Sequence, residues 1–162
     1  MPPQTDADFS ELYEASYDGI YRVCRGYCGD AEQAADLTQE VFIRAWKAWD
    51  RFEGRSKART WLYRIAVNTC LMEKRKRRIP LQSLGPEASL ADDTTEEDPR
   101  VAQLYHHISQ LPETDRLTIS LVLEQVPYPE IADTLGASEN SLRVRIHRIK
   151  KRLAQSFQHE TA

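Results

Sequence analysis

The final helix that the sequence predicts has two faces of opposite character. Its apolar stripe, at the helical step of 100° per residue, consists of Leu142, Ile146, Ile149 and Leu153. The opposite face holds polar and basic side chains with one valine among them: Asn140, Arg143, Val144, His147, Arg148 and Lys151. In the major groove of DNA, arginine pairs with guanine and valine contacts a thymine methyl, while other cations suit phosphates. This face therefore predicts a DNA contact.

The turn before this helix strengthens that prediction. A charged outer face on an isolated helix is more often an ordinary solvated surface. Here, however, Pro129 stands at the start of a short helix, and Gly136, Ala137 and Ser138 supply a turn and a cap before the basic helix. A helix, a tight turn and a basic helix form the arrangement in which helix-turn-helix proteins place their second helix in the major groove.

A second basic block lies near the middle of the chain. After Glu73 it consists of Lys74, Arg75, Lys76, Arg77 and Arg78. The net charge of the whole chain is −3, because residues 1–20 contain five acidic side chains and residues 87–98 contain six, with no Lys or Arg in either segment. The net charge of the whole chain therefore does not reveal that its basic residues are concentrated in two separate helices. This distribution of positive charge suits a nucleic-acid ligand.

Two amphipathic helices are expected before the middle basic block. Apolar residues at i, i+3 and i+4 spacing predict a helix over residues 9–28, ending near Gly29. Asp30 followed by Gln33 has capping-box spacing and opens a second helix that continues to about residue 49. The inner face of this second helix is expected to contain Phe42, Ala45, Trp46 and Trp49.

The rest of the periodicity divides the chain into two helical parts. A third helix is expected from Trp61 to Met72 and onward through the basic block, ending at Pro80. The following segment combines proline and glycine with acidic residues, as is typical of a linker with little structure. Helical spacing then returns. We predict an all-α protein with two small domains and a flexible acidic linker: residues 1–79, 80–100 for the linker, and 101–162.

The sequence offers no sign of catalytic or membrane chemistry. We find no Gly-rich phosphate loop, metal-ligand cluster or nucleophile triad, so we predict no enzyme, cofactor or metal. No run reaches the roughly 18 apolar residues of a spanning helix, and the acidic start does not direct export. Cys24, Cys28 and Cys70 include no CxxC pair and fit a reducing cytoplasm, with packing favoured over a metal or redox role for the first two.

Several segments resemble the sigma factors of bacterial RNA polymerase. The second conserved region of that family is resembled by ADLTQEVFIRAW at residues 35–46, RTWLYRIAVN at 59–68 and KRKRR at 74–78. The fourth region is resembled by LPETDR at 111–116, PEIADTLG at 129–136 and SLRVRIHRIKKRL at 141–153. The two regions stand in family order, without counterparts of the first and third. This form is that of the extracytoplasmic-function (ECF) group, and it implies a non-enzymatic factor that directs core polymerase to promoters.

The resemblance also implies protein partners. The family places one face of the second helix on the clamp helices of the largest polymerase subunit, and here that face is Asp36, Gln39, Glu40 and Ile43. Two acids beside an amide suit a basic partner helix, although a solvated face is the alternative. The flap of the second largest subunit is a further implied partner. An anti-sigma factor that holds the protein inactive is compatible with the resemblance.

For promoter DNA, the resemblance implies two contacts. A flipped base of the minus-ten element would enter a pocket at the loop before the third helix, made by Phe52, Ser56, Lys57 and Asn68. An aromatic ring can stack on a base while an amide reads its edge, although Phe52 could equally be part of the core. The basic block with Lys74, Arg75, Arg77 and Arg78 would bind the same DNA, and the final helix would read the minus-thirty-five element.

Three residues depart from the family pattern. Ala58 stands where a large aromatic is usual, Met72 where an aspartate is common, and Val144 where a small polar residue is frequent. The promoter sequence is therefore not predicted. A stand-alone helix-turn-helix regulator is the main alternative function, and it would bind an operator without polymerase.

Overall fold

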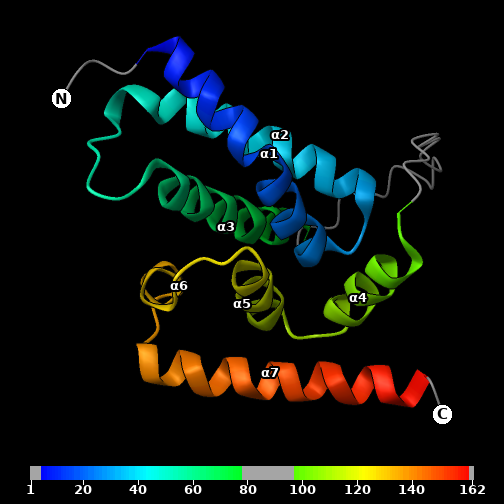
Figure 1. Cartoon of the computed structure of the whole chain (residues 1–162). Coiled ribbons are helices and arrows are strands. Elements are labelled where there is room, and N and C mark those ends of the chain that lie inside the picture. Colours follow the sequence, from blue (N-terminus) through cyan, green and yellow to red (C-terminus); the bar gives the residue numbers. More distant parts are fainter. Residues whose placement is uncertain (1–4, 78–96, 161–162) are drawn as a thin grey trace.

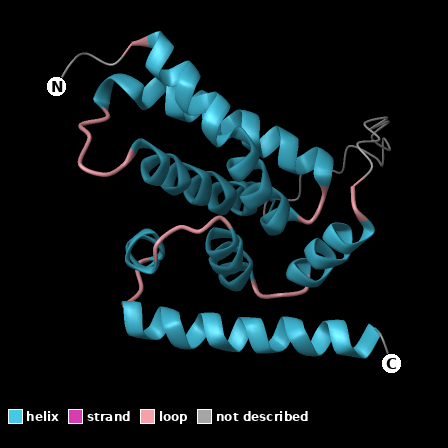
Figure 2. Ribbon diagram, viewed as in Figure 1, coloured by secondary structure: helices cyan, strands magenta, loops and turns pink. Residues whose placement is uncertain are grey.

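The computed structural model describes residues 5–77 and 97–160, and all regular structure within these ranges is helical, as predicted (Figures 1 and 2). The N-terminal half contains α1 (Asp6–Cys28), α2 (Ala31–Ala48), the short 3-10 helix η1 (Trp49–Arg51) and α3 (Ala58–Arg77). The C-terminal half contains α4 (Pro99–Ser109), α5 (Glu113–Leu123), α6 (Tyr128–Leu135) and α7 (Glu139–Glu160). Most of the expected acidic linker, up to residue 96, lies outside the described residues.

The capping residues explain where most helices begin and end. Gly29 closes α1 in the left-handed conformation, with a φ of 76° that suits glycine. The Asp30 carboxylate accepts the Glu32 N–H at 3.4 Å and opens α2. By contrast, α3 begins at Ala58, three residues before the predicted start. The prediction missed Ala58, Arg59 and Thr60 because they do not continue the hydrophobic periodicity that begins at Trp61.

The N-terminal half packs α1, α2 and α3 around a core of aliphatic and aromatic side chains (Figure 1). The prediction that Trp46 belongs to this core is wrong, since 47% of its surface is exposed. Trp49, one turn later, occupies the core and is 5% exposed. Trp46 instead packs edge-on against Phe9, with ring centroids 5.0 Å apart, at the rim between α1 and α2. Of the two cysteines predicted to pack, Cys24 is buried as expected and Cys28 is only half-buried; Cys70 is also buried.

The C-terminal half consists of α7 and three shorter helices, which lie between α7 and the N-terminal half (Figure 1). The predicted apolar stripe of α7 is confirmed, because Leu142, Ile146, Ile149 and Leu153 are all buried. The second pair packs with Tyr105, Ile108 and Ile119 in a separate cluster.

The two halves share one hydrophobic core, which the sequence did not predict. Leu117 and Leu121 of α5 and Ile131 of α6 belong to the same buried cluster as side chains of α1 and α3. Gly26 of α1 faces α5 so closely that a Cβ atom there would overlap the Ser120 hydroxyl. The absence of a side chain at this position therefore allows α1 and α5 to approach each other.

Candidate nucleic-acid and protein interfaces

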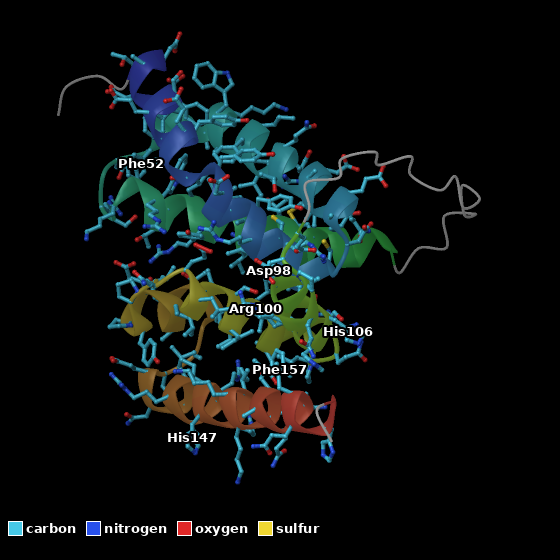
Figure 3. The ribbon with its side chains drawn as sticks, turned by 45° about the vertical axis from the view of Figure 1, so that its right-hand side comes forward. Phe52, Asp98, Arg100, His106, His147 and Phe157 are labelled. Atoms are coloured by element: carbon cyan, nitrogen blue, oxygen red, sulfur yellow. The ribbon has the colours of Figure 1, made fainter. Side chains whose placement is uncertain are left out.

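The outer face of α7 is open to solvent along its length. All six predicted DNA-contacting residues are exposed: Asn140, Arg143, Val144, His147, Arg148 and Lys151. Val144 has 66% of its surface exposed, an unusual position for an apolar side chain on a helix that also buries an apolar stripe. Figure 3 shows His147 on the side of α7 that points away from the rest of the molecule. The structure thus brings the predicted residues together on one uncovered surface.

The cations of this face differ in how tightly the protein holds them. Arg143 donates to Glu139 at 3.0 Å and lies over the Tyr128 ring, 5.1 Å from its centroid. Arg148 and Lys151 have no partner within the described chain. Arg143 is thus oriented in advance, whereas the other two side chains remain available to a ligand.

The turn before α7 has the geometry that the sequence predicted. Gly136 adopts the left-handed conformation with a φ of 67° and ends α6. The Ser138 hydroxyl then accepts the Ser141 N–H at 3.2 Å, which satisfies a free donor in the first turn of α7. Ile131 and Leu142 are both fully buried, so the two helices are fixed to each other by packing as well as by the turn.

The loop before α3 holds three of the four residues predicted for the minus-ten pocket. Phe52 stacks on Trp49 with a centroid distance of 5.7 Å and also contacts Trp61 at 4.9 Å, so one side of its ring is part of the packing. Ser56 is half-buried and Lys57 is exposed in the same loop. Asn68 is not brought to them: it is exposed on α3, ten residues beyond Ala58 and so about 15 Å farther along the axis.

The basic end of α3 is described only in part. Lys74, Arg75 and Arg77 belong to the last turns of the helix, and their side chains lie outside the described residues. Arg78 also lies outside them.

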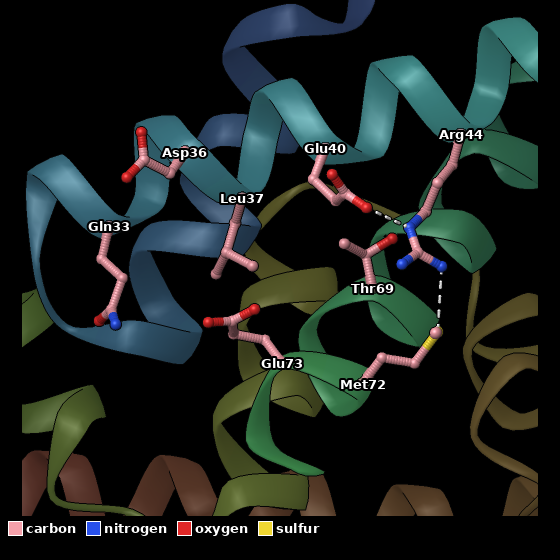
Figure 4. A pocket seen from close by; sticks show the side chains of 8 residues that line it. All are labelled: Gln33, Asp36, Leu37, Glu40, Arg44, Thr69, Met72 and Glu73. Atoms are coloured by element: carbon pink, nitrogen blue, oxygen red, sulfur yellow. Dashed lines mark hydrogen bonds and ion pairs between the residues drawn. The ribbon is translucent and has the colours of Figure 1, made fainter. Parts of the chain in front are cut away.

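The predicted polymerase-binding face of α2 lies between two hollows of different chemistry. Asp36 and Glu40 line a hollow of about 290 Å³ together with Glu73 and Met72 of α3 (Figure 4). In this hollow, Arg44 donates hydrogen bonds to the Glu40 carboxylate at 2.8 Å and to the Met72 sulfur at 3.1 Å. Gln39 and Ile43 line the other, of about 360 Å³. Its remaining residues are aromatic: Phe9, Tyr13, Tyr17, Phe42 and Trp46. We call this second hollow the aromatic groove.

Sequence reasoning missed the aromatic groove because it assigned its aromatic residues to the core. The signal was present in the spacing: Tyr13 of α1 and Trp46 of α2 lie at the edges of their apolar stripes, where a helix pair leaves side chains half-covered. Tyr13, Ile43 and Trp46 are between 41% and 50% exposed. An exposed apolar surface beside acidic residues is typical of a protein-binding site.

A row of polar contacts joins the two halves, and we call it the seam. Arg22 of α1 makes two hydrogen bonds to Glu124, one of them from Nη2 to Oε2 at 2.9 Å. Thr60 of α3 donates to Glu130 at 2.7 Å, and Arg64 pairs with Asp133. The Glu124 side chain is only 6% exposed, and its hydrogen bond raises the pKa of the Arg22 guanidinium. These partners stand 69 to 102 positions apart, so no local pattern predicts them.

Other chemistry is not evident in the described part of the chain. None of its helices combines the length and apolar character needed to cross a bilayer. It contains no group of His, Cys, Asp and Glu side chains arranged to hold a metal ion.

Comparison with known families identifies both halves. The family model described as Sigma-70 region 2 matches residues 12–79, and that described as Sigma-70, region 4 matches residues 102–153. The ECF RNA polymerase sigma factor SigE of Mycolicibacterium smegmatis is 33% identical over 157 residues, which cover 90% of this chain and 60% of that protein. The RNA polymerase sigma-H factor of Pseudomonas aeruginosa is 33% identical over 80% of this chain and 75% of that protein. SigW of Bacillus subtilis is 29% identical over 92% and 88%.

Solved structures show the same fold. The sigma factor RpoE, in complex with the anti-sigma factor NepR from Bartonella quintana, superimposes with a TM-score of 0.78 and 21% identity, covering 93% of this chain and 97% of that one. CnrH, in complex with the cytosolic domain of CnrY, gives a TM-score of 0.69 and 20% identity over 96% and 90%.

Proposed function

Because the chain belongs to the ECF group of RNA polymerase sigma factors, we propose that it directs core polymerase to specific promoters for transcription initiation. The observation that carries this proposal is that both sigma regions occur on one chain in family order. A stand-alone helix-turn-helix regulator would account for α6 and α7 but would leave the Sigma-70 region 2 match over residues 12–79 unexplained.

The C-terminal half would read the minus-thirty-five element. The uncovered face of α7 presents Arg148 for a guanine, Val144 for a thymine methyl and Lys151 for a phosphate. The orientation of Arg143 by Glu139 and Tyr128 favours a contact at a defined position.

The N-terminal half would bind polymerase and the minus-ten element. Asp36 and Glu40 suit a basic helix of the largest subunit, and the aromatic groove beside Ile43 offers that partner an apolar contact. Phe52, Ser56 and Lys57 form a candidate site for an unstacked base at the start of α3, while exposed Asn68 would contact DNA farther along the helix.

The protein would act in the cytoplasm by binding rather than by catalysis. The flap of the second largest polymerase subunit is the partner proposed for the C-terminal half. The two structural neighbours were solved in complexes with NepR and with CnrY, and by analogy we propose that this chain also binds an anti-sigma factor.

The decisive test is protection of promoter DNA by the purified protein with and without core polymerase. Candidate promoters can be found by sequencing RNA made by the reconstituted holoenzyme on genomic fragments. A sigma factor is expected to protect the minus-ten and minus-thirty-five elements only with core, and to support transcription from them. Specific protection by the protein alone, with no effect of core, would instead establish the stand-alone regulator.

A further inference from the structure

Arg143 occupies a different side of α7 from the residues at the centre of its outer face. At the helical step it lies about 100° around the helix from the buried Leu142, whereas Asn140 and Val144 lie about 160° and 200° from it. Arg143 therefore projects from the flank of α7, between the buried stripe and the outer face. Tyr128, the first residue of α6, lies beside this flank, since its ring centroid is 5.1 Å from the guanidinium carbon of Arg143.

The flank of a helix in the major groove meets a different part of DNA from its outer face. A helix with its side chains is about 10–12 Å wide, and the major groove is about 12 Å wide. A helix that points its outer face at the base edges therefore fills the groove, and its flanks approach the two sugar-phosphate walls. The first turns of a recognition helix are the ones that enter the groove, and Arg143 belongs to them because α7 begins at Glu139.

Two contacts hold the Arg143 guanidinium in one orientation. Its Nη2 donates to Oε1 of Glu139 at 3.0 Å, and its carbon lies over the ring of Tyr128. Tyr128 is half-buried and packs against the larger hydrophobic cluster, so its ring is a fixed support. Glu139 lies about 60° from Leu142, on the buried side of Arg143, so its carboxylate stands behind the guanidinium as seen from the outer face. Glu139 uses one of the five N–H donors of the guanidinium, and the others remain for a ligand.

We propose, on the basis of the proposed function, that Arg143 and Tyr128 form a clamp for one backbone phosphate of the minus-thirty-five element. Arg143 supplies the charge and the hydrogen-bond donors, and Tyr128 is its positioning residue. The clamp joins α7 to α6, so it fixes both helices of the helix-turn-helix to one point on the DNA. Phosphate contacts set the position of a protein on the duplex without carrying sequence information themselves. The clamp therefore holds the outer face of α7 over the base pairs that it contacts.

A guanidinium that is already oriented suits this task better than a mobile cation. Arginine has a long side chain, and immobilising such a side chain on binding reduces affinity. In this protein the orientation is present before DNA is bound. Arginine also presents two parallel N–H donors to two phosphate oxygens, whereas a lysine ammonium acts as a point charge. The geometry thus predicts a phosphate contact that a lysine at position 143 would not replace.

The measurement is holoenzyme binding to promoter duplexes in which one phosphate at a time, on either strand of the minus-thirty-five element, is replaced by a neutral methylphosphonate. For the wild type, replacement of the clamped phosphate is expected to weaken binding about tenfold, as the loss of a charged hydrogen bond does. Arg143→Ala should lose about the same factor on the unmodified promoter, and the methylphosphonate should then cost less than about twofold. The rank order of bases at each position should stay unchanged, while the magnitude of the salt slope falls by about one unit.

Two substitutions at Tyr128 separate its positioning role from its packing. Tyr128→Phe keeps the ring and should preserve the wild-type methylphosphonate effect. Tyr128→Leu removes the aromatic support, and the effect at the clamped position should fall from about tenfold to about threefold or less, with the salt slope kept because Arg143 is still charged. Thermal melts show whether α6 remains folded. Should Tyr128→Leu unfold, Arg143→Lys makes the same test on an exposed residue, since it keeps the charge but lacks the planar group.

Arg152→Ala is the matched control for loss of an arginine from α7. Arg152 is also exposed but lies about 180° around the helix and about 14 Å along it from Arg143, so its removal should leave the effect at the clamped phosphate unchanged. Equal methylphosphonate sensitivity in the wild type and in Arg143→Ala, or a base preference altered at one position in Arg143→Ala, would overturn the clamp. Sequence-specific binding of the wild-type holoenzyme to the unmodified promoter would show that the proposed function stands even then, and its absence would overturn both.

Discussion

The helices α3 and α7 are both basic and both assigned to promoter DNA, yet the protein treats them differently. The outer face of α7 is uncovered, and Arg148 and Lys151 have no partner in the described chain. On α3, Arg64 and Thr60 are engaged by carboxylates of α6. The outer face of α7 is therefore open to a ligand in this arrangement, whereas part of the α3 surface is covered by α6.

The largest expected effect tests whether the buried and exposed faces of α7 are separate. Leu142→Ala removes a fully buried side chain where α6 meets α7 and is expected to lower the free energy of unfolding by about 2–5 kcal/mol. Val144→Ala, two residues away on the exposed face, should change it by about 0.5 kcal/mol or less. Urea denaturation followed by circular dichroism measures both. Equal losses in the two variants would mean that the outer face of α7 is packed, not open.

The next prediction concerns the exposed face of α2, which is proposed to bind polymerase rather than DNA. Asp36→Arg with Glu40→Arg places like charges against a basic helix and is expected to weaken binding to core polymerase by about 10- to 100-fold, or 1.4–2.8 kcal/mol. The amide variant Asp36→Asn with Glu40→Gln should lose less, because it removes attraction without adding repulsion. Co-purification with core is the measurement, with helix content as the control. Undiminished co-purification of the reversed variant would remove the polymerase assignment from this face.

The sequence predicted best those features of the fold and the site that are set within one helix. The two faces of α7 were predicted residue by residue, because its apolar stripe and its basic face lie on one helix and periodicity separates them. Gly29, Asp30 and Gly136 marked helix ends through local backbone chemistry. Predictions that rest on the local chemistry of one helix, such as these caps and the two faces of α7, therefore agreed with the structure, apart from the start of α3.

The failures concern residues whose environment is set by another element. Trp46 has the spacing of a core residue, but α1 covers only one side of it. Asn68 was grouped with the loop before α3 by resemblance, whereas the rise of the helix separates them. The seam pairs Arg22 with Glu124 across 102 positions, and neither residue carries a local signal for the other. Tertiary contacts between polar side chains leave no periodicity to detect.

A smaller effect tests whether the exposed face of α7 contacts the bases of DNA. If Arg148 makes a bidentate contact with guanine, Arg148→Ala should weaken holoenzyme binding by roughly 1–3 kcal/mol and relax preference at one position of the minus-thirty-five element. Thermal stability should be unaffected, because the side chain is exposed. Lys150→Ala is the control, since Lys150 is also exposed on α7 but lies about 160° around the helix from Arg148. The same loss of binding in both variants, with no change in base preference, would show that Arg148 acts only as a non-specific cation.

The smallest expected effect distinguishes a phosphate contact from a base contact on the same helix. Lys151 is exposed and unpaired within the described chain, and a lysine ammonium binds phosphate as a point charge without reading sequence. Lys151→Ala should therefore weaken binding evenly across a promoter panel and lower the magnitude of the salt slope by about one unit, because one fewer counterion is released. The measurement is holoenzyme affinity for the panel at several salt concentrations, with thermal melts alongside. A sequence-dependent loss would make Lys151 a base reader. An unchanged slope in this variant, together with unchanged preference in Arg148→Ala, would show that the open face of α7 does not contact DNA and that its exposure has another cause.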